Sequence, residues 1–374
     1  MKIVHIITGL KDGGAENVLY KICKYDDHNN HIVISLTIGG KYFLLLKKFG
    51  IKVYSIDMKF YSIFKFFNLI KLLHELNPDI VQTWLIHGDF IGGIAARLAG
   101  IKNIVWNILY SKLEISSEKL ITIFLLRILG KLSYILPKLI IVISKSAKKN
   151  CLKIGYCKKK LCLIFSGFDF SLFKVNKYQK LLFRKKIKIQ KHIKTIGIVA
   201  RYHPIKDHEN LLNALSIIKS NNKNFNCIFV GFNMNKNNRE LTNKIKKLQL
   251  NKNVKLLGPI KNIPQVMNGL DVHILCSKSE GFPSVIVEAM ACGTPCIVTD
   301  VGDARFIVGK TGWVVPAMNP LRLANAIESA LLAIDKNKWK KRCIRARLRV
   351  KNKFEMKEMI KSYNLAWAKV CNKN

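Results

Sequence analysis

The stretch from Cys276 to Pro316 reads CSKSEGFPSVIVEAMACGTPCIVTDVGDARFIVGKTGWVVP. The apolar run 272–276 that leads into it is typical of a buried strand. Ser284 is a residue type that caps helices, and apolar side chains then recur at helical spacing up to Gly293, a residue suited to ending a helix. A second apolar run, 296–299, predicts the next strand. The stretch is therefore predicted to be a strand–loop–helix–strand unit of an α/β sheet.

The loop and helix start of this unit suit a ligand with hydroxyls at both ends and phosphates between them. Ligands of open parallel sheets bind at the carboxyl ends of the strands, and the N–H groups of a helix start attract phosphate. Glu280 precedes the predicted helix and Glu288 lies on its second turn, eight positions later. Since a carboxylate accepts several hydrogen bonds, each can hold paired hydroxyls. A nucleotide sugar has this layout.

These residues resemble the E-x7-E signature of the retaining GT-B glycosyltransferases of family 4, above all the bacterial enzymes that build capsule, O-antigen and other surface polysaccharides. The resemblance implies that Glu280 contacts the donor sugar and Glu288 the nucleotide ribose. Two isolated glutamates would more often be solvated charges beside a helix, but the EGFP turn and the AMACGTPCIVTD run favour the site. The donor-binding turn is expected to include Gly281, Phe282, Pro283, Ser284 and Val285.

Two basic residues follow the predicted strand 193–200. Arg201 and Lys206 stand five positions apart, at the spacing at which the resembled family has an Arg and a Lys on the donor diphosphate. Two cations there can neutralise the charge that develops on the leaving diphosphate as the sugar bond breaks. The alternative is two ordinary basic residues, out of 64, on a surface loop.

The first half of the chain contributes two further candidates. After the predicted strand 2–8, Gly13 and Gly14 belong to a GGAE loop that is similar to the first loop of many family 4 enzymes. Such a glycine pair alone is a weak signal. His87 follows the strand 78–84 within HGDF, which resembles the family's HADL-type loop. The resemblance implies a contact of His87 with the donor sugar, whereas a lone histidine would more often be structural.

The resemblance implies an α/β fold of the GT-B type, with two Rossmann-like domains facing each other across a cleft. The expected boundaries are 1–170 with 355–374 for the first, acceptor-side domain, 171–192 for a linker, and 193–354 for the nucleotide-sugar-binding domain. The last helix is expected to cross back onto the first domain.

The composition indicates a globular chain with a large positive charge. Lys and Arg number 64 against 23 Asp and Glu, a formal net charge of +41, which attracts anionic partners such as acidic lipid. The abundance of Lys, Ile and Asn also fits the bias of an AT-rich genome. The helices predicted at 59–76 and 119–136 combine apolar and basic residues, which fits either packing on a sheet or lying in a membrane surface.

The ten cysteines form no CxxC pair or zinc-like block, and they predict reduced thiols in a cytoplasmic protein. The N-terminus is interpreted as a first strand and not a signal peptide, and no transmembrane helix is expected. The predicted location is the inner face of the cell membrane.

The sequence therefore predicts transfer of a sugar from a UDP- or GDP-linked donor to a hydroxyl of a glycan or polyprenyl-diphosphate-linked saccharide, with retained configuration. No metal and no cofactor other than the donor are expected, since no Asp-x-Asp stands at the diphosphate. Three alternatives remain at this point: a nucleotide-sugar epimerase of double-Rossmann fold, a non-catalytic family member, and a nucleic-acid-binding protein, the last suggested only by charge.

Overall fold

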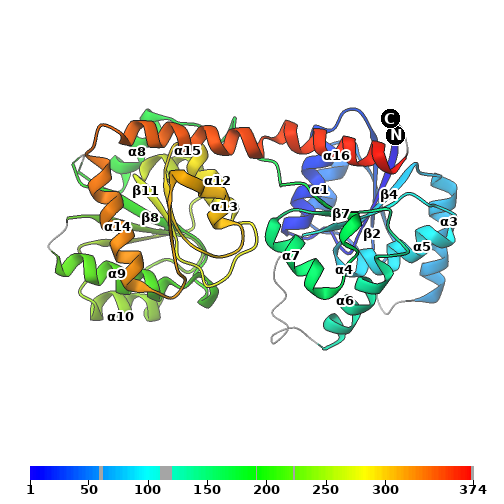
Figure 1. Cartoon of the computed structure of the whole chain (residues 1–374), viewed down its shortest axis with the longest axis horizontal. Coiled ribbons are helices and arrows are strands. Elements are labelled where there is room, and N and C mark those ends of the chain that lie inside the picture. Colours follow the sequence, from blue (N-terminus) through cyan, green and yellow to red (C-terminus); the bar gives the residue numbers. More distant parts are fainter. Residues whose placement is uncertain (59–61, 110–119, 191, 222–223, 372–374) are drawn as a thin grey trace. The chain divides into compact units, whose positions relative to one another are not determined.

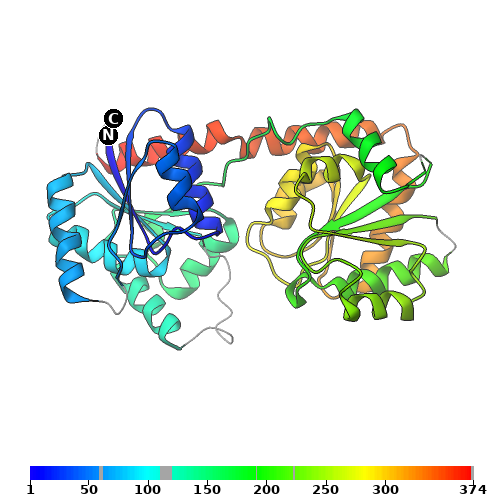
Figure 2. The same ribbon diagram turned by 180° about the vertical axis from the view of Figure 1, so that it is seen from behind.

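The computed structural model of the chain describes residues 1–58, 62–109, 120–190, 192–221 and 224–371. The chain divides into a first unit, Met1–Phe168 with Met356–Asn374, and a second unit, Asp169–Glu355. Each unit has its own parallel sheet with helices on both sides, as the two opposite views in Figures 1 and 2 show. The predicted architecture of two Rossmann-like domains is confirmed.

The first unit is built on a seven-stranded sheet in the order β3-β2-β1-β4-β5-β6-β7, in which every pairing is parallel. Its strands read as nearly continuous apolar runs, which is expected of a parallel sheet that is covered on both faces. The strands are β1 Lys2–Ile7, β2 Asn30–Ser35, β3 Lys52–Ser55, β4 Ile80–Trp84, β5 Ile104–Ile108, β6 Leu139–Val142 and β7 Leu161–Leu163.

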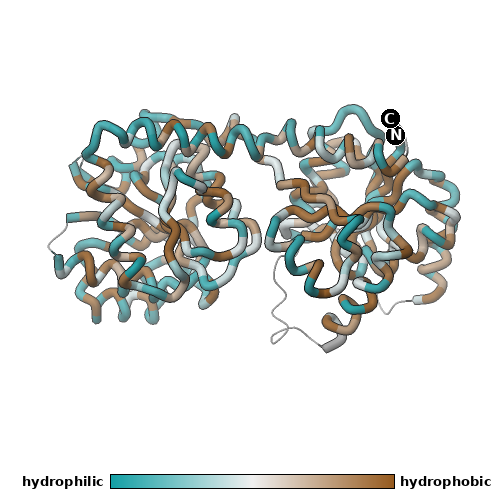
Figure 3. Tube along the Cα trace, in the orientation of Figure 1, coloured by the Kyte–Doolittle hydropathy of each residue, from teal (hydrophilic) through white to brown (hydrophobic). Residues whose placement is uncertain are grey.

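Helices cover this sheet on both faces. One core contains side chains of α1, α2 and α16, and the other contains side chains of α3, α5, α6 and α7. In Figure 3 the strands inside each unit are predominantly hydrophobic and the outer turns of many helices hydrophilic. The helices are α1 Gly14–Tyr25, α2 Lys41–Lys48, α3 Ile63–Leu76, α4 Leu85–His87, the π-helical turn η2 Gly88–Gly92, α5 Gly93–Leu98, α6 Leu120–Leu132, α7 Lys145–Ile154, η3 Lys158–Lys160 and α16 Met356–Val370.

The C-terminal helix α16 returns to the first unit, as predicted. Its buried Trp367 donates a hydrogen bond to Gln82 Oε1 at 2.7 Å, and the buried Tyr363 donates to Asn107 Oδ1 at 3.1 Å. Both acceptors lie on central strands, β4 and β5. Polar groups buried inside a strand cost free energy unless they are paired, so these two bonds fix the helix on one face of the sheet.

A chain of hydrogen bonds runs through the core beneath α16. The indole Nε1–H of Trp84, which can only donate, points at Nδ1 of His5 at 3.2 Å. His5 must therefore carry its proton on Nε2, which lies 3.0 Å from Nδ1 of His31. The Nε2–H of His31 in turn donates to Asp26 Oδ2 at 3.0 Å. One donor-only group thus sets the tautomers of two buried histidines, and the chain ends on a carboxylate.

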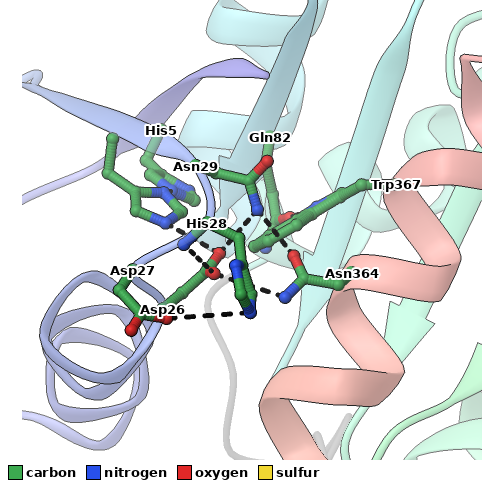
Figure 4. A network of polar contacts seen from close by, with 9 residues as sticks. His5, Asp26, Asp27, His28, Asn29, Gln82, Asn364 and Trp367 are labelled. Carbon is green, nitrogen blue, oxygen red and sulfur yellow. Dashed lines mark hydrogen bonds and ion pairs between the residues drawn. The ribbon is translucent and has the colours of Figure 1, made fainter.

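Asp26 collects several donors at the end of this chain (Figure 4). Asn29 donates to Asp26 Oδ2 at 2.8 Å and Asn364 of α16 donates to Oδ1 at 3.3 Å. Burial alone would raise the pKa of Asp26, but the hydrogen bonds from His31, Asn29 and Asn364 outweigh it and lower the pKa to about 2. The ionised carboxylate therefore contributes to holding α16 on the sheet.

The second unit has a six-stranded parallel sheet in the order β10-β9-β8-β11-β12-β13. Its strands are β8 Thr195–Val199, β9 Asn226–Val230, β10 Val254–Gly258, β11 Val272–Leu275, β12 Cys296–Thr299 and β13 Trp313–Val315. Its helices are α8 Lys177–Lys186, η4 Pro204–Lys206, α9 His208–Ser220, α10 Arg239–Lys247, α11 Ile263–Gly269, α12 Ser284–Ala291, α13 Ala304–Val308, η5 Gly309–Thr311, α14 Pro320–Ile334 and α15 Trp339–Phe354.

The predicted linker, 171–192, contains α8, and its described residues, 171–190 and 192, belong to the second unit. Phe183 of this helix is buried among apolar side chains of the second unit. Arg184 donates from Nε to the carbonyl of Gly269 at 3.0 Å and from Nη2 to Asp271 at 2.6 Å. The lysine-rich composition does not predict this packing, because two buried side chains fix the helix and most of the others face solvent.

The helices for which a membrane role was considered are α3 and α6. Residues 59–61 and 119 of the predicted ranges lie outside the described residues. Among the described helices, none is both long enough and apolar enough to cross a membrane.

Replacing Asp26 with Asn is expected to lower the free energy of unfolding near neutral pH by about 2 kcal/mol, from the lowered pKa of Asp26. The folded-state pKa lies below the unfolded value, so the contribution is present above about pH 4 and is lost as the pH falls toward 2. Urea unfolding followed by circular dichroism across this range should show a difference between wild type and variant that shrinks with acid.

Asp27→Asn is the matched control, because it removes the same charge from a neighbouring side chain that is 91% exposed. Its effect should stay within about 0.5 kcal/mol. Equal destabilisation by both variants would show that net charge and not the buried network is responsible.

Candidate functional site

A pocket of about 420 Å³ opens at the carboxyl ends of β8 and β11 in the second unit. These strands are neighbours, and the strand order changes direction at β8, which lies between β9 and β11. Open α/β sheets bind ligands at such a point. The pocket is lined by Ile198, Val199, Ala200, Arg201, Lys206, Ile274, Leu275, Ser277, Glu280, Phe282, Pro283, Ser284 and Val285. The structure therefore brings together Arg201, Lys206, Glu280 and most of the predicted donor-binding turn.

Glu280 is held by two donors. Lys206 donates from Nζ to Glu280 Oε1 at 2.6 Å, and the hydroxyl of Ser277 donates to the same oxygen at 2.6 Å. The side chains of Lys206 and Glu280 are 23% and 13% exposed, so this ion pair is largely desolvated. No hydrogen bond from a described residue to the second oxygen, Oε2, is present. Glu280 thus has one oxygen fixed by the protein and one available to a ligand.

Ser277 was not predicted as a site residue. It is buried at the end of β11, and Thr299 donates to its carbonyl oxygen at 2.7 Å. Its signal in the sequence is only a serine three positions before the glutamate, which is common in any polar turn. Its role depends on the turn 277–280, which brings the carboxylate of Glu280 within hydrogen-bond distance of the Ser277 hydroxyl.

The loop after β12 is hydrogen-bonded to the turn that carries Glu280. Asp303 N donates to the carbonyl of Gly281 at 2.9 Å. Gly302 has φ +53°, and a Cβ at this position would lie 2.4 Å from the carbonyl oxygens of Glu280 and Gly281. Only glycine allows this approach, so Gly302 sets the position of the Glu280 backbone.

The loop that carries Lys206 is tied to the same turn. Lys278 N donates to the carbonyl of Ile205 at 2.8 Å, and the thiol of Cys276 contacts the carbonyl of Lys206 at 3.1 Å. Arg201 lines the pocket and is exposed, and no ion pair with another described residue neutralises it. The pocket therefore holds one cation paired to Glu280 and one available to an anion.

The helix α12 begins at the pocket. Its N-cap is Pro283, which forms no side-chain capping bond, and Ser284 is the first helical residue instead of the predicted cap. In the first turn, Ile286 N donates to the carbonyl of Pro283 at 3.1 Å, while the N–H groups of Ser284 and Val285 have no intrahelical acceptor and can donate to a ligand or to water. A helix start with its dipole directed at a pocket beside Arg201 and Lys206 favours phosphate.

Glu288 is half-buried on the second turn of α12 and is not among the residues that line the pocket. It stands one helical turn beyond Ser284, so the two side chains share a face of the helix. The pairing of Glu280 and Glu288 at opposite ends of one ligand stays a prediction.

The first-unit candidates lie at one edge of their own sheet. Gly13 caps α1 after β1, and a Cβ there would meet Glu16 Oε2 at 2.3 Å. Gly14 begins the helix. His87 ends α4 directly after β4, and β1 and β4 are adjacent parallel strands. The two loops therefore leave the sheet at the same edge, and their contact with the donor stays a prediction.

A buried acid supports the His87 loop. Asp89 lies within the π-helical turn that follows His87, and Thr83 of β4 donates to its Oδ1 at 2.6 Å. Burial raises the pKa of Asp89 well above its usual value. Asp89 therefore serves to attach the loop to the strand and has no access to a ligand.

Within the described part of the chain, His5, Cys23 and His31 bring metal-ligand atoms within 4.8 Å of one another. A metal on His5 Nε2 would require the ring proton on Nδ1, but that nitrogen faces the indole N–H of Trp84 at 3.2 Å. Two hydrogens would then point at each other. The group fits the hydrogen-bond chain better than a metal site.

Comparisons with known proteins agree with this geometry. Residues 12–172 match the family model for Glycosyltransferase Family 4, and residues 179–346 match that for Glycosyl transferases group 1. The chain is 26% identical to the capsular polysaccharide biosynthesis glycosyltransferase CapH of Staphylococcus aureus over 77% of this chain and 78% of the relative. It is also 26% identical to CapM of the same organism, over 94% of this chain and 93% of the relative.

Solved structures show the same fold. HepE from Anabaena, crystallised with UDP, is 24% identical and superposes with a TM-score of 0.86 over 99% of this chain and 100% of its own. A glycosyltransferase from Rickettsia africae is 21% identical, with a TM-score of 0.83 over 100% and 99% of the two chains. With a family model on each half and a GT-B architecture throughout, the chain belongs to the family 4 glycosyltransferases.

Proposed function

We propose that this glycosyltransferase moves a sugar from a nucleoside-diphosphate sugar to a hydroxyl of a lipid-linked saccharide or glycan, with retained configuration, in the synthesis of a surface polysaccharide. The observation that carries the proposal is the Glu280 carboxylate held by Lys206 and Ser277 in the wall of a pocket that Arg201 also lines. Similar proteins include an Escherichia coli enzyme named as a UDP-Gal galactosyltransferase that acts on a diphosphoundecaprenol-linked sugar. HepE was crystallised with UDP-glucose as well as with UDP.

The diphosphate of the donor would lie against Arg201, Lys206 and the start of α12. As the bond to the sugar breaks, negative charge grows on the leaving diphosphate. Fixed positive groups stabilise that charge more than the charge of the intact donor, and this difference accelerates the reaction. These groups supply the positive charge that the transfer needs at this end of the site.

Glu280 would hold the transferred sugar. Its Oε1 is fixed by Lys206 and Ser277, which leaves Oε2 to accept a hydrogen bond from a sugar hydroxyl. The carboxylate also supports the positive charge that develops at the anomeric carbon as the donor bond lengthens. Glu288, further along α12, would contact the ribose, and His87 with Gly13 and Gly14 would contribute from the first unit.

The comparisons offer no support for the epimerase and nucleic-acid-binding alternatives: CapH, CapM and the Escherichia coli and Campylobacter jejuni relatives are all named as glycosyltransferases. Among them is a Campylobacter jejuni N-acetylgalactosaminyltransferase named for a diphospho-undecaprenol-linked acceptor. A membrane-anchored acceptor of that kind would require the enzyme to work at a lipid surface.

The first unit presents apolar side chains suited to such a surface. On α3, Phe64 is 79% and Phe67 is 60% exposed, and on α6 Phe124 is 67% exposed. Arg127 and Lys131 of α6 add basic charge, and anionic lipid attracts each such residue near its surface by about 1 kcal/mol. We propose that these helices attach the protein peripherally to the cytoplasmic face of the cell membrane.

Replacing Glu280 with Ala should lower sugar transfer by about 100- to 1,000-fold, because a fixed charge at the reacting centre is lost. Acceptor-dependent release of nucleoside diphosphate measures the rate, and circular dichroism verifies the fold. Glu209→Ala is the control, since Glu209 is an exposed glutamate of the same unit that pairs with Lys244. Wild-type activity in the Glu280 variant would rule out its role.

Replacing Arg201 and Lys206 together with Ala should weaken binding of the nucleotide sugar by about 100-fold or more, because two charged hydrogen-bond donors to the diphosphate disappear. Isothermal titration calorimetry measures the loss. The exposed pair Lys246 and Lys247, replaced in the same way, removes the same net charge and should leave affinity within about twofold. Similar losses in the two variants would mean that only net charge matters.

Replacing Phe64 and Phe67 with Ser should reduce sedimentation with anionic vesicles by at least about fivefold at low salt, since the loss of two inserted aromatic side chains costs more than 1 kcal/mol. The control replaces Phe232 and Leu321 of the second unit, which are 67% and 57% exposed. No binding of the wild type at low salt, or equal loss in the control, would remove the membrane proposal.

A further inference from the structure

A second pocket of about 520 Å³ lies in the second unit, away from the Glu280 pocket. It is formed by the residues that precede β13, by the end of α14 and by the start of α15. Since the strands of this sheet are parallel, the start of β13 and the ends of β8 and β11 belong to opposite edges of the sheet. The two pockets are therefore separate sites. The lining residues are Lys310, Thr311, Trp313, Ser329, Ala333, Lys336, Lys338, Trp339, Lys341, Arg342 and Arg345.

The second pocket is far more basic than the chain as a whole. Six of its eleven lining residues are Lys or Arg, and none is acidic, whereas Lys and Arg make up 64 of the 374 residues of the chain. The two acids nearest in sequence are engaged elsewhere: Asp335 pairs with Lys194, and Glu328 accepts a hydrogen bond from Asn221. Like charges around a hollow repel one another, and an anion inside it relieves that repulsion.

The pocket also has a rigid aromatic wall. The rings of Trp313 and Trp339 lie 6.4 Å apart at 31°, and both pack on the core of the second unit. Arg342 lies over the Trp313 ring at 4.4 Å and donates from Nη1 to the carbonyl of Thr311 at 3.0 Å. Trp313 donates in turn to the hydroxyl of Ser329 at 3.3 Å. One guanidinium and two indoles are thus held in place before any ligand arrives.

We propose that this pocket binds an anionic saccharide, with a sugar ring against the indole wall and its carboxylate or phosphate groups on the lysines and arginines. A pocket of this volume is the size of a small-ligand site. Binding of single-stranded nucleic acid requires an extended groove that follows several phosphates, and the cations here surround one hollow. A ligand with its own hydroxyls also matches the wall. The Ser329 hydroxyl accepts from Trp313 and still has its proton to donate, and the Thr311 hydroxyl, which donates to the carbonyl of Val308 at 2.7 Å, can accept.

The test measures binding of a galacturonate trisaccharide and of glucose 6-phosphate to the whole protein by calorimetry at low salt. Replacing Lys336, Lys338 and Lys341 with Gln is expected to weaken binding of the preferred probe by about tenfold or more. These side chains are exposed and form no ion pair with a described residue, so the variant should fold normally. The matched control replaces the exposed Lys246, Lys247 and Lys252 of the same unit and should leave the affinity unchanged.

Each other outcome overturns the proposal: no binding of either probe, equal loss in both triple variants, equal affinity for maltotriose or inorganic phosphate, or tighter binding of a single-stranded oligonucleotide of the same charge. The probe that binds with the higher affinity shows whether the pocket prefers a carboxylate or a phosphate. Binding should persist in Glu280→Ala, in which transfer is expected to be lost, so this site and the transferase site can fail independently.

Discussion

The site depends on one constraint, the parallel arrangement of strands that are buried on both faces. A parallel strand is followed by a crossover, most often a helix, that returns to the starting edge, so the carboxyl ends of all strands gather at one edge of the sheet. In the second unit the strand order changes direction at β8, and the loops after β8 and β11 leave side by side. Arg201 and Glu280 stand on these two loops, more than seventy positions apart in sequence, and meet because of the topology.

The ion pair between Lys206 and Glu280 explains how a cation and a carboxylate can share one pocket before the donor binds. Burial of an isolated carboxylate is costly, and here Lys206 and Ser277 compensate for it. On the proposed function, an arriving diphosphate competes with Glu280 for Lys206, and the sugar hydroxyls take over the freed acceptor positions. The donor thus replaces one set of charge-assisted hydrogen bonds with another, so the carboxylate need not be buried without partners at any stage.

Much of this could be predicted from the sequence, because apolar runs and turn residues are local signals. The alternation of strands and helices was predictable in this way, whereas the returning last helix and the clustering of Arg201, Lys206 and Glu280 were implied by the resemblance to the family 4 enzymes. Ser277 and Gly302 were not, because their roles depend on two loops that meet only in the folded unit. The helix start at Ser284 was misread as a cap, since a serine before an apolar run fits both positions.

Other features were not predicted, because the residues that form them lie far apart in the sequence. The hydrogen-bond chain through His5, His31 and Asp26 joins residues of β1, β2 and the end of α1, and it is completed by Asn364 of α16. No window of sequence contains this set. The lysine-rich composition of α8 predicts a linker, since its two buried side chains, Phe183 and Arg184, are the ones that fix it to the second unit.

The structure shows where the basic residues of the protein lie, and their distribution is uneven. A compositional bias toward lysine would spread the surplus of +41 evenly over the exposed surface. In α15 the basic residues instead stand without any acid, and several of them surround a hollow with an indole wall. Mutual repulsion at such a place lowers stability, and a chain that is merely rich in lysine has no reason to concentrate it beside two tryptophans. Surplus charge that is concentrated and shaped in this way is better understood as a binding feature than as background.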